Sequence, residues 1–187
     1  MPYDNLRELP PDLPEPPADG AADHLPGTVI PSVLLPATDG STIDLASVNG
    51  RVVVFAYPRT GRPGDEPFVP EWDQIPGARG CTPQTCSFRD LATEFSAFHC
   101  RIFGLSTQDA AYQKEMADRL RLPFPVLSDS ELKLTTALGL PAMQVAGTTL
   151  LRRLAFIADD GVIGKVFYPV FPPDRNAADV LAWLAGH

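Results

Sequence analysis

Apolar residues along the chain form short continuous runs separated by stretches with helical spacing. Two β-branched and aromatic runs, 52–57 and 101–106, predict buried central strands, and Pro58 closes the first. A shorter strand is expected at 125–127. Apolar positions three and four residues apart then predict a helix after each strand. These helices are expected at 82–98, 109–122 and 130–138.

Two turn signals predict hairpins on either side of this alternating part. Asp39-Gly40-Ser41 separates residues 33–35 from residues 42–45, and Asp159-Asp160-Gly161 separates residues 152–158 from residues 162–168. An amphipathic helix over 176–185 closes the chain. This order of elements predicts an α/β fold, with a mixed sheet covered by helices on both faces.

Proline is concentrated in two segments. Nine of the 21 prolines fall in the first 36 residues, and residues 1–26 carry six acids against one arginine. We therefore expect an extended acidic arm over 1–26, followed by one domain over 27–187. A second Pro/Gly-rich stretch, 62–80, predicts a long inserted loop, and loops of this length are often functional. We expect Trp72 to anchor this loop by burial.

Composition and charge exclude several classes of function. The chain has 187 residues and a formal net charge of −8, which disfavours contact with a nucleic-acid backbone. It contains no apolar run near the length of a membrane span, and its start lacks the pattern of a secretory signal. Three cysteines, an odd number, do not make a disulfide framework. A cytosolic location is therefore expected.

Cys81 is the first candidate for chemistry. It follows Gly80 directly and precedes the predicted helix, for which Thr82 is the expected N-cap. Amide groups at a helix N-terminus and the neighbouring Arg79 would both stabilise a thiolate, the reactive form of cysteine. The alternative is a buried structural thiol at the end of a loop.

A second cysteine, Cys86, lies five residues further along the same helix. Five helical steps rotate it about 140° and move it ~7.5 Å along the axis from Cys81. A disulfide requires Cα atoms about 4.4–6.8 Å apart, so the two thiols would join only if the first turns unwind. A protected reactive thiol with a partner released by local unfolding is the logic of a two-step thiol peroxidase.

Zinc is the competing explanation for paired cysteines. The spacing here is C-x4-C without a second pair, and the histidines at 24, 99 and 187 do not complete a ligand set. No metal site is therefore expected. Cys100 comes just before a predicted strand, and we expect it to be a partly buried structural residue.

The segment 80–90, Gly-Cys-Thr-Pro-Gln-Thr-Cys-Ser-Phe-Arg-Asp, resembles the G-C-T-x-[EQ]-x-C-x-F-R-D segment of the Q-type peroxiredoxins, the bacterioferritin-comigratory-protein group. The resemblance extends from about Gly27 to the C-terminus. It implies a thioredoxin-like fold, with an N-terminal hairpin and, in this chain, an inserted loop before the active-site helix. It also implies that Cys81 is the peroxidatic cysteine and Cys86 the resolving cysteine.

This chain departs from the family pattern at the hydroxyl that normally bonds to the thiolate. The family has Pro-x-x-x-Thr/Ser-x-x-Cys, whereas here 16 further residues, 65–80, separate Pro58 and its following loop from Cys81. The position three before Cys81 is Ala78, which has no hydroxyl. We expect the inserted loop to leave and return, so that Thr60 supplies this hydroxyl. Thr85 is a weaker candidate.

The family arginine, usually in Arg-x-Thr-Phe, has two candidates here. Alignment on the Asp160-Gly161 turn places it at Arg152. Strand alternation directs Arg153 to the opposite face, so only one of the two serves the site. The prediction is Arg152.

Together these residues predict a thiol peroxidase that reduces hydrogen peroxide and organic hydroperoxides and is reset by a thioredoxin-type dithiol. No metal, haem, flavin or nucleotide cofactor is expected, and the protein is expected to be a monomer or weak dimer without nucleic-acid or membrane partners. Two alternatives use the same fold: a thiol–disulfide oxidoreductase, which would normally show C-x-x-C, and a non-catalytic redox-sensing or interaction protein.

Overall fold

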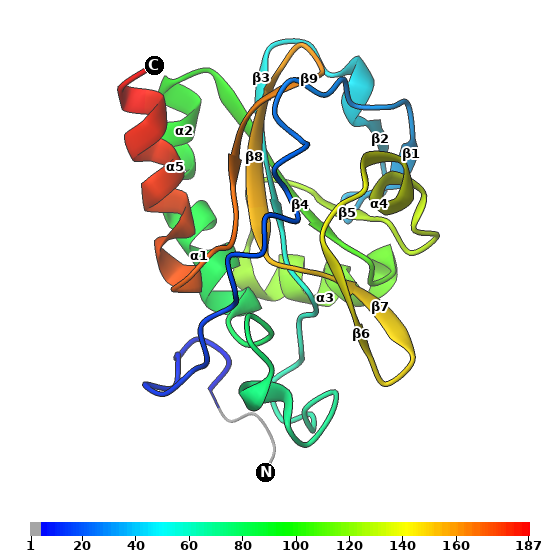
Figure 1. Ribbon diagram of the computed structural model, residues 1–187, viewed down its shortest axis with the longest axis vertical. Coiled ribbons are helices and arrows are strands. Elements are labelled where there is room, and N and C mark those ends of the chain that lie inside the picture. Colours follow the sequence, from blue (N-terminus) through cyan, green and yellow to red (C-terminus); the bar gives the residue numbers. More distant parts are fainter. Residues whose placement is uncertain (1–4) are drawn as a thin grey trace.

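A five-stranded sheet forms the centre of the computed structural model, which describes residues 5–187 (Figure 1). The strand order is β5-β4-β3-β8-β9. Strands β3, β4 and β5 are parallel, while β8 runs antiparallel to β3 and β9 antiparallel to β8. Their bounds are Arg51–Ala56 (β3), Cys100–Ser106 (β4), Val126–Ser128 (β5), Leu154–Asp159 (β8) and Val162–Phe167 (β9). The predicted mixed sheet is confirmed.

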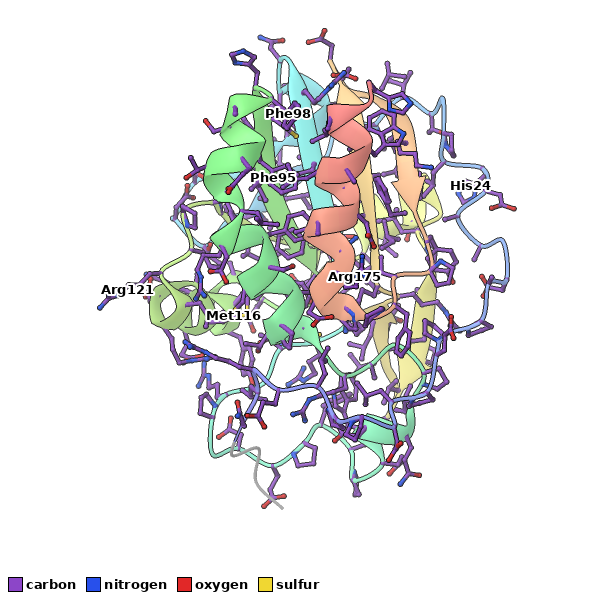
Figure 2. All side chains as sticks on the ribbon, turned by 90° about the vertical axis from the view of Figure 1, so that its left-hand side faces the viewer. His24, Phe95, Phe98, Met116, Arg121 and Arg175 are labelled. Atoms are coloured by element: carbon purple, nitrogen blue, oxygen red, sulfur yellow. The ribbon has the colours of Figure 1, made fainter. Side chains whose placement is uncertain are left out.

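Helices α1 (Cys81–Asp90), α2 (Ala92–Ala97) and α5 (Asn176–Ala185) cover one face of the sheet (Figures 1 and 2). α3 (Ala110–Leu120) adds Met116 and Leu120 to the apolar cluster beneath them. The other face is covered by the hairpin of β1 (Leu34–Pro36) and β2 (Thr42–Asp44), by α4 (Lys133–Leu138) and by residues 22–30. Both faces of β3 are therefore buried, as its continuous apolar run predicts.

A hairpin of β6 (Ala142–Val145) and β7 (Thr148–Leu151) lies outside the elements that the sequence patterns predict. Its turn places Ala146 and Gly147 at positive φ, 48° and 76°. Such two-residue turns usually carry Asn-Gly or Asp-Gly, because a residue with a β-carbon rarely adopts positive φ. Ala-Gly is a weaker signal, and the hairpin was missed for that reason.

The predicted helix over 82–98 is wrong in two respects. It begins at Cys81, with Gly80 rather than Thr82 as its N-cap, and it breaks at Leu91 into α1 and α2. The helical spacing of Phe88, Phe95 and Phe98 in the sequence predicts that all three face the core, and the break disrupts this spacing. Phe88 and Phe95 are fully buried, whereas Phe98 follows α2 and is 38% exposed. Figure 2 shows Phe98 near the end of α2.

The first described part of the arm, residues 5–17, and the inserted loop both lie at one end of the molecule (Figure 1). Residues 5–28 contain neither helix nor strand. The inserted loop contains one short 3-10 helix, Trp72–Gln74. Burial of Trp72 is confirmed, since it is 4% exposed and belongs to a cluster with Val145 and Leu150 of the β6–β7 hairpin. None of the helices among residues 5–187 has the length and apolar character of a transmembrane segment.

Candidate active site

Cys81 is the first residue of α1 and is only 5% exposed. The residue before it, Gly80, has a φ of 110°, which side chains rarely allow. A β-carbon on Gly80 would also lie 2.5 Å from Cγ of Pro173, so the approach to Cys81 requires glycine. The thiol thus lies beside the unpaired amides of the first helical turn, which favour a negative charge.

Arg153, not Arg152, contacts Cys81. Its Nη2 lies 3.5 Å from the Cys81 Sγ, and Arg153 is 3% exposed. The prediction of Arg152 is therefore wrong, although the alternation behind it holds. Ala155 and Ile157 of β8 belong to the cluster under α1. Arg153 is two residues before Ala155, so its side chain lies on the same side of the strand. Arg152 lies on the other side of the strand, where its Nε donates to the Ala142 carbonyl at 3.2 Å.

Carbonyl groups at the end of the inserted loop hold the Arg153 guanidinium. Nη2 donates to the carbonyls of Gly77, Ala78 and Arg79, each at 3.1 Å. No ion pair within residues 5–187 involves Arg153. A buried cation without a carboxylate partner favours an anion nearby, and the thiol it touches is that of Cys81. The guanidinium therefore places a positive charge and a hydrogen-bond donor directly against the Cys81 sulfur.

Sequence reasoning missed a buried chain of amides behind Arg153. The Gln84 Oε1 accepts from Nη1 of Arg153 at 2.5 Å. The Gln84 Nε2 in turn donates to Oδ1 of Asn176, the first residue of α5, at 2.9 Å. Gln84 and Asn176 are 0% and 2% exposed. Gln84 stands at the [EQ] position of the motif, but no pattern in the sequence connects it to a residue 92 positions away.

The predicted hydroxyl contact is also wrong. The Thr60 hydroxyl donates to the Gly61 carbonyl at 3.4 Å, and no hydrogen bond between Thr60 and Cys81 occurs in the described structure. The Thr60 backbone pairs with the Gln108 side chain instead, through bonds of 2.8 and 3.0 Å. The Thr85 hydroxyl donates to the Cys81 carbonyl rather than to the sulfur, at 2.8 Å.

Pro58 is buried just after β3, where its carbonyl accepts from Oγ of Ser106 at 3.3 Å. Tyr57 precedes it, and burial, with a smaller contribution from Cys81, raises the pKa of Tyr57 well above its ordinary value. Tyr57 and Cys81 belong to the same buried cluster, so the end of β3 borders the site. The inserted loop does return to the site, but through its backbone carbonyls at 77–79 and not through Thr60.

Cys86 lies on the same helix as Cys81, and its side chain is half-buried. Burial raises the pKa of its thiol, an effect that the charge of Arg89 partly opposes. All three cysteines are free thiols. The structure therefore presents the reduced, folded state, in which Cys86 is a poor nucleophile until it becomes exposed.

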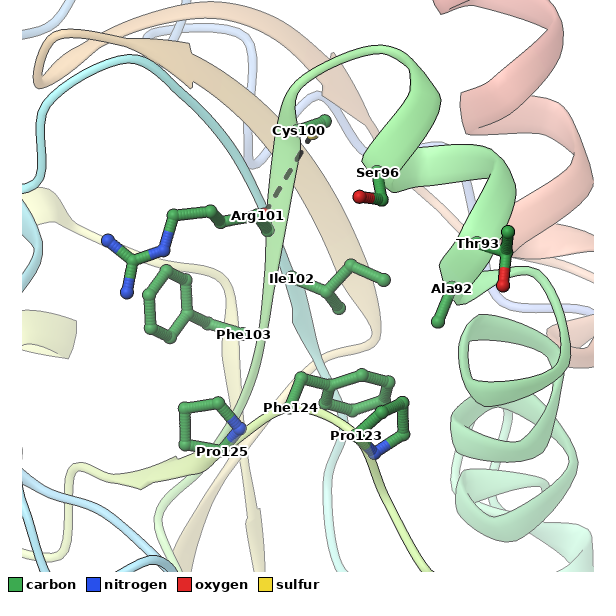
Figure 3. Close-up of a pocket in the computed structure, with 10 residues that line it drawn as sticks. All are labelled: Ala92, Thr93, Ser96, Cys100, Arg101, Ile102, Phe103, Pro123, Phe124 and Pro125. Carbon is green, nitrogen blue, oxygen red and sulfur yellow. Dashed lines mark hydrogen bonds between the residues drawn. The ribbon is translucent and has the colours of Figure 1, made fainter.

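Cys100 lies apart from this site, at the start of β4 beside a groove of about 510 Å³ (Figure 3). Figure 3 shows it facing α2, across from Ser96. Burial raises the pKa of Cys100 to about 12, so the thiol is protonated at neutral pH. A structural role accords with this. Within residues 5–187 no group of three or more His, Cys, Asp or Glu side chains is arranged to hold a metal ion.

The fold and site define a class of protein: a mixed α/β sheet that presents a buried cysteine at a helix start, held by an arginine. The Redoxin family model matches residues 25–181, and the chain belongs to that family. Within it the chain is a Q-type peroxiredoxin. It is 30% identical to peroxiredoxin Q of Gentiana triflora over 96% of this chain and 77% of the relative.

Solved structures agree on the thioredoxin-like peroxiredoxin fold. Peroxidoxin BcpB of Mycobacterium tuberculosis superposes with a TM-score of 0.69 and 28% identity, covering 86% of this chain and 96% of BcpB. Prx3 of Vibrio vulnificus, in a reduced form with hydrogen peroxide, superposes with a TM-score of 0.66 and 25% identity. The match covers 87% of this chain and 96% of Prx3. The match to peroxiredoxin Q of rice (japonica) is 31% identical over 84% of this chain but spans only 65% of the relative.

Proposed function

We propose that this protein is a thiol peroxidase that reduces hydrogen peroxide and organic hydroperoxides. The observation that carries the proposal is the contact between the buried Arg153 guanidinium and the Cys81 sulfur at the start of α1. A positive charge and free helix amides at one sulfur favour the thiolate and stabilise charge that develops on a departing oxygen.

In the first step the Cys81 thiolate attacks one oxygen of the hydroperoxide. An S–O bond forms, the O–O bond breaks, and the second oxygen leaves as hydroxide or alkoxide, which takes up a proton to become water or an alcohol. Sulfur is oxidised by two electrons to a sulfenic acid while the peroxide is reduced. Arg153 contributes here as a donor to the developing anion.

In the second step the Cys86 sulfur attacks the sulfenic sulfur of Cys81. An S–S bond forms, the S–O bond breaks, and the hydroxyl leaves as water with the proton of Cys86. A dithiol then reduces the disulfide by thiol–disulfide exchange and itself becomes oxidised. We assign this role to a thioredoxin-type reductant, and the expectation of a monomer or weak dimer in the cytosol stays a prediction.

The relatives support the proposal. Curated plant relatives carry the name peroxiredoxin Q, and the Prx3 structure from Vibrio vulnificus is described as a complex with hydrogen peroxide. The chain differs from a C-x-x-C oxidoreductase, because its cysteines are spaced C-x4-C.

The test is rapid mixing of the reduced protein with hydrogen peroxide, followed by mass spectrometry of quenched samples. We expect rapid loss of one thiol and then one Cys81–Cys86 disulfide per chain. Cys81→Ser should abolish peroxide consumption, while Cys100→Ser should leave it unchanged. Peroxide consumption that survives in Cys81→Ser would refute the assignment.

Cys86→Ser separates the two steps. This variant should complete one oxidation, fail to turn over with thioredoxin and thioredoxin reductase, and accumulate sulfinic acid at Cys81. A Cys81–Cys100 disulfide in this variant would instead make Cys100 an alternative resolving residue.

A further inference from the structure

The N-terminal arm lies against the residues that lead into α1 (Figure 1). Nη2 of Arg79 donates to the carbonyls of Asn5 and Glu8, at 3.0 and 3.4 Å. A β-carbon on Gly80 would lie 3.0 Å from Cδ2 of Leu9. The arm thus contacts two consecutive residues immediately before Cys81.

A further contact lies slightly upstream. A β-carbon on Gly77 would lie 3.4 Å from Cβ of Pro16. Gly77 supplies one of the carbonyls that hold Arg153. The arm therefore contacts both the backbone that carries Cys81 and the backbone that holds its arginine.

These contacts cover residues that must move during the second step. In the folded helix Cys81 and Cys86 are separated by ~7.5 Å along the axis and about 140° around it, and a disulfide needs Cα atoms about 4.4–6.8 Å apart. The first turn of α1 and the residues before it must therefore unwind. Attack on the peroxide needs no such movement, because it involves only the sulfur of Cys81.

The arm is fixed at its far end and lies on the surface over its first part. Leu25 is fully buried, the His24 ring bonds to the Leu138 carbonyl at 2.9 Å, and the Gly27 amide donates to the Ile163 carbonyl at 2.7 Å. Residues 5–17, in contrast, are exposed or only partly buried. This first part can detach while residues 22–30 hold the arm to the domain.

We propose that residues 5–17 are a positioning segment for the reaction: they hold residues 77–81 in the reduced arrangement and must release them before Cys86 attacks the Cys81 sulfenic acid. The inference rests on the proposed function. Ala78 also packs in the Trp72 cluster, which keeps the carbonyls that hold Arg153 in place when the arm detaches, so peroxide attack is unaffected. The segment slows formation of the disulfide, so the sulfenic acid persists longer. A second peroxide then has more time to oxidise it to sulfinic acid, with reduction of that peroxide to water or an alcohol.

Rapid-quench mass spectrometry on the full chain tests this by following sulfenic acid and disulfide separately. The variants are Leu9→Ser, a chain that lacks residues 1–17, the conservative Leu9→Met, and Asp12→Ser as a control at an exposed arm position. In Leu9→Ser and the shortened chain we expect disulfide formation to accelerate about tenfold, as the loss of one half-buried leucine contact would allow. Sulfenic acid formation should change less than about twofold by comparison.

The same two variants should need about tenfold more peroxide to reach half-maximal sulfinic acid, because that product reflects competition between the two steps. Leu9→Met and Asp12→Ser should behave like wild type. Unchanged disulfide formation in Leu9→Ser would overturn the proposal, and so would a parallel fall of both steps. If the shortened chain does not fold, the rates of disulfide formation in Leu9→Ser and Leu9→Met still test the proposal. Failure of the wild type to form a Cys81–Cys86 disulfide would instead refute the proposed function itself.

Discussion

At the scale of single residues, the site depends on one buried arginine whose charge is balanced by carbonyl oxygens and a thiol. Gly77, Ala78 and Arg79 contribute their carbonyls, so side-chain substitutions in the loop leave these acceptors in place. Arg152 does not take the place of Arg153. Arg152 is next to it in sequence but belongs to the opposite side of the strand.

Arg153→Gln should therefore slow the reaction of Cys81 with hydrogen peroxide by about 100-fold, the usual cost of removing one donor to a developing anion. Arg152→Gln is the matched control and should retain nearly wild-type kinetics. Stopped-flow measurement at several peroxide concentrations distinguishes them. Equal losses in the two variants would show that the contact at 3.5 Å is not the one that matters.

Thr60→Val should leave the oxidation rate of Cys81 within about twofold of wild type, because no hydrogen bond to the sulfur is lost. The Thr60 backbone keeps its two bonds to Gln108, so the fold should also persist. A rate loss of about tenfold or more, equivalent to the free energy of a charged hydrogen bond, would restore Thr60 as the missing hydroxyl.

At the scale of elements, β4 carries a cysteine that has no part in the site. The ordinary pKa of a thiol is 9.0, and burial raises that of Cys100 to about 12. The folded state therefore holds this proton more tightly than the unfolded chain. Its contribution to stability is complete below about pH 9 and declines as the pH rises toward 12.

Cys100→Ala should remove this alkaline sensitivity. Between pH 8 and pH 10 the wild type should lose about 1 kcal/mol more free energy of unfolding than the variant, because the slope approaches 1.4 kcal/mol per pH unit above the unfolded pKa. Urea unfolding at the two pH values measures the difference. Equal losses would mean that Cys100 does not stay protonated in the folded protein.

At the scale of the whole molecule, the inserted loop joins distant parts of the fold. Trp72 packs with Val145 and Leu150 of the β6–β7 hairpin, and the end of the loop holds Arg153, which follows that hairpin. Phe68 packs edge-on against Trp72, with ring centroids 6.0 Å apart. The loop thus forms a small apolar cluster with the β6–β7 hairpin, and this cluster holds the loop carbonyls against Arg153.

Trp72→Ala should disrupt this cluster. Truncation of this buried aromatic side chain should lower the free energy of unfolding by about 3 kcal/mol. The carbonyls at 77–79 should then be misplaced, which should slow Cys81 oxidation by about tenfold. Trp183→Ala, on α5, is the control and should leave the oxidation rate unchanged. Hydrogen exchange over 68–80 together with stopped-flow kinetics provides both readouts. Normal kinetics with faster exchange would separate the loop from the chemistry.

Local patterns in the sequence were sufficient for the five strands of the central sheet, for the buried Cys81 at a helix start and for the anchoring role of Trp72, but not for the β6–β7 hairpin or the break between α1 and α2. Each predicted feature depends on residues within a few positions of one another, through periodicity, turn chemistry or helix geometry. The family motif implied the resolving role of Cys86. None of these inferences required knowledge of which distant segments meet.

Only the tertiary structure decided the rest. The choice between Arg152 and Arg153 depended on which residues of β8 face each side of the sheet. The pairing of Leu154 with Ala56 fixes this, whereas alternation in the sequence is compatible with a shift of one residue. The pairing of Gln84 with Asn176, the bond from Arg153 to the Ala78 carbonyl, and the arm beside Gly80 all join residues far apart in the chain. Such contacts follow from packing of the whole molecule, because no local pattern specifies which distant partner satisfies a buried polar group.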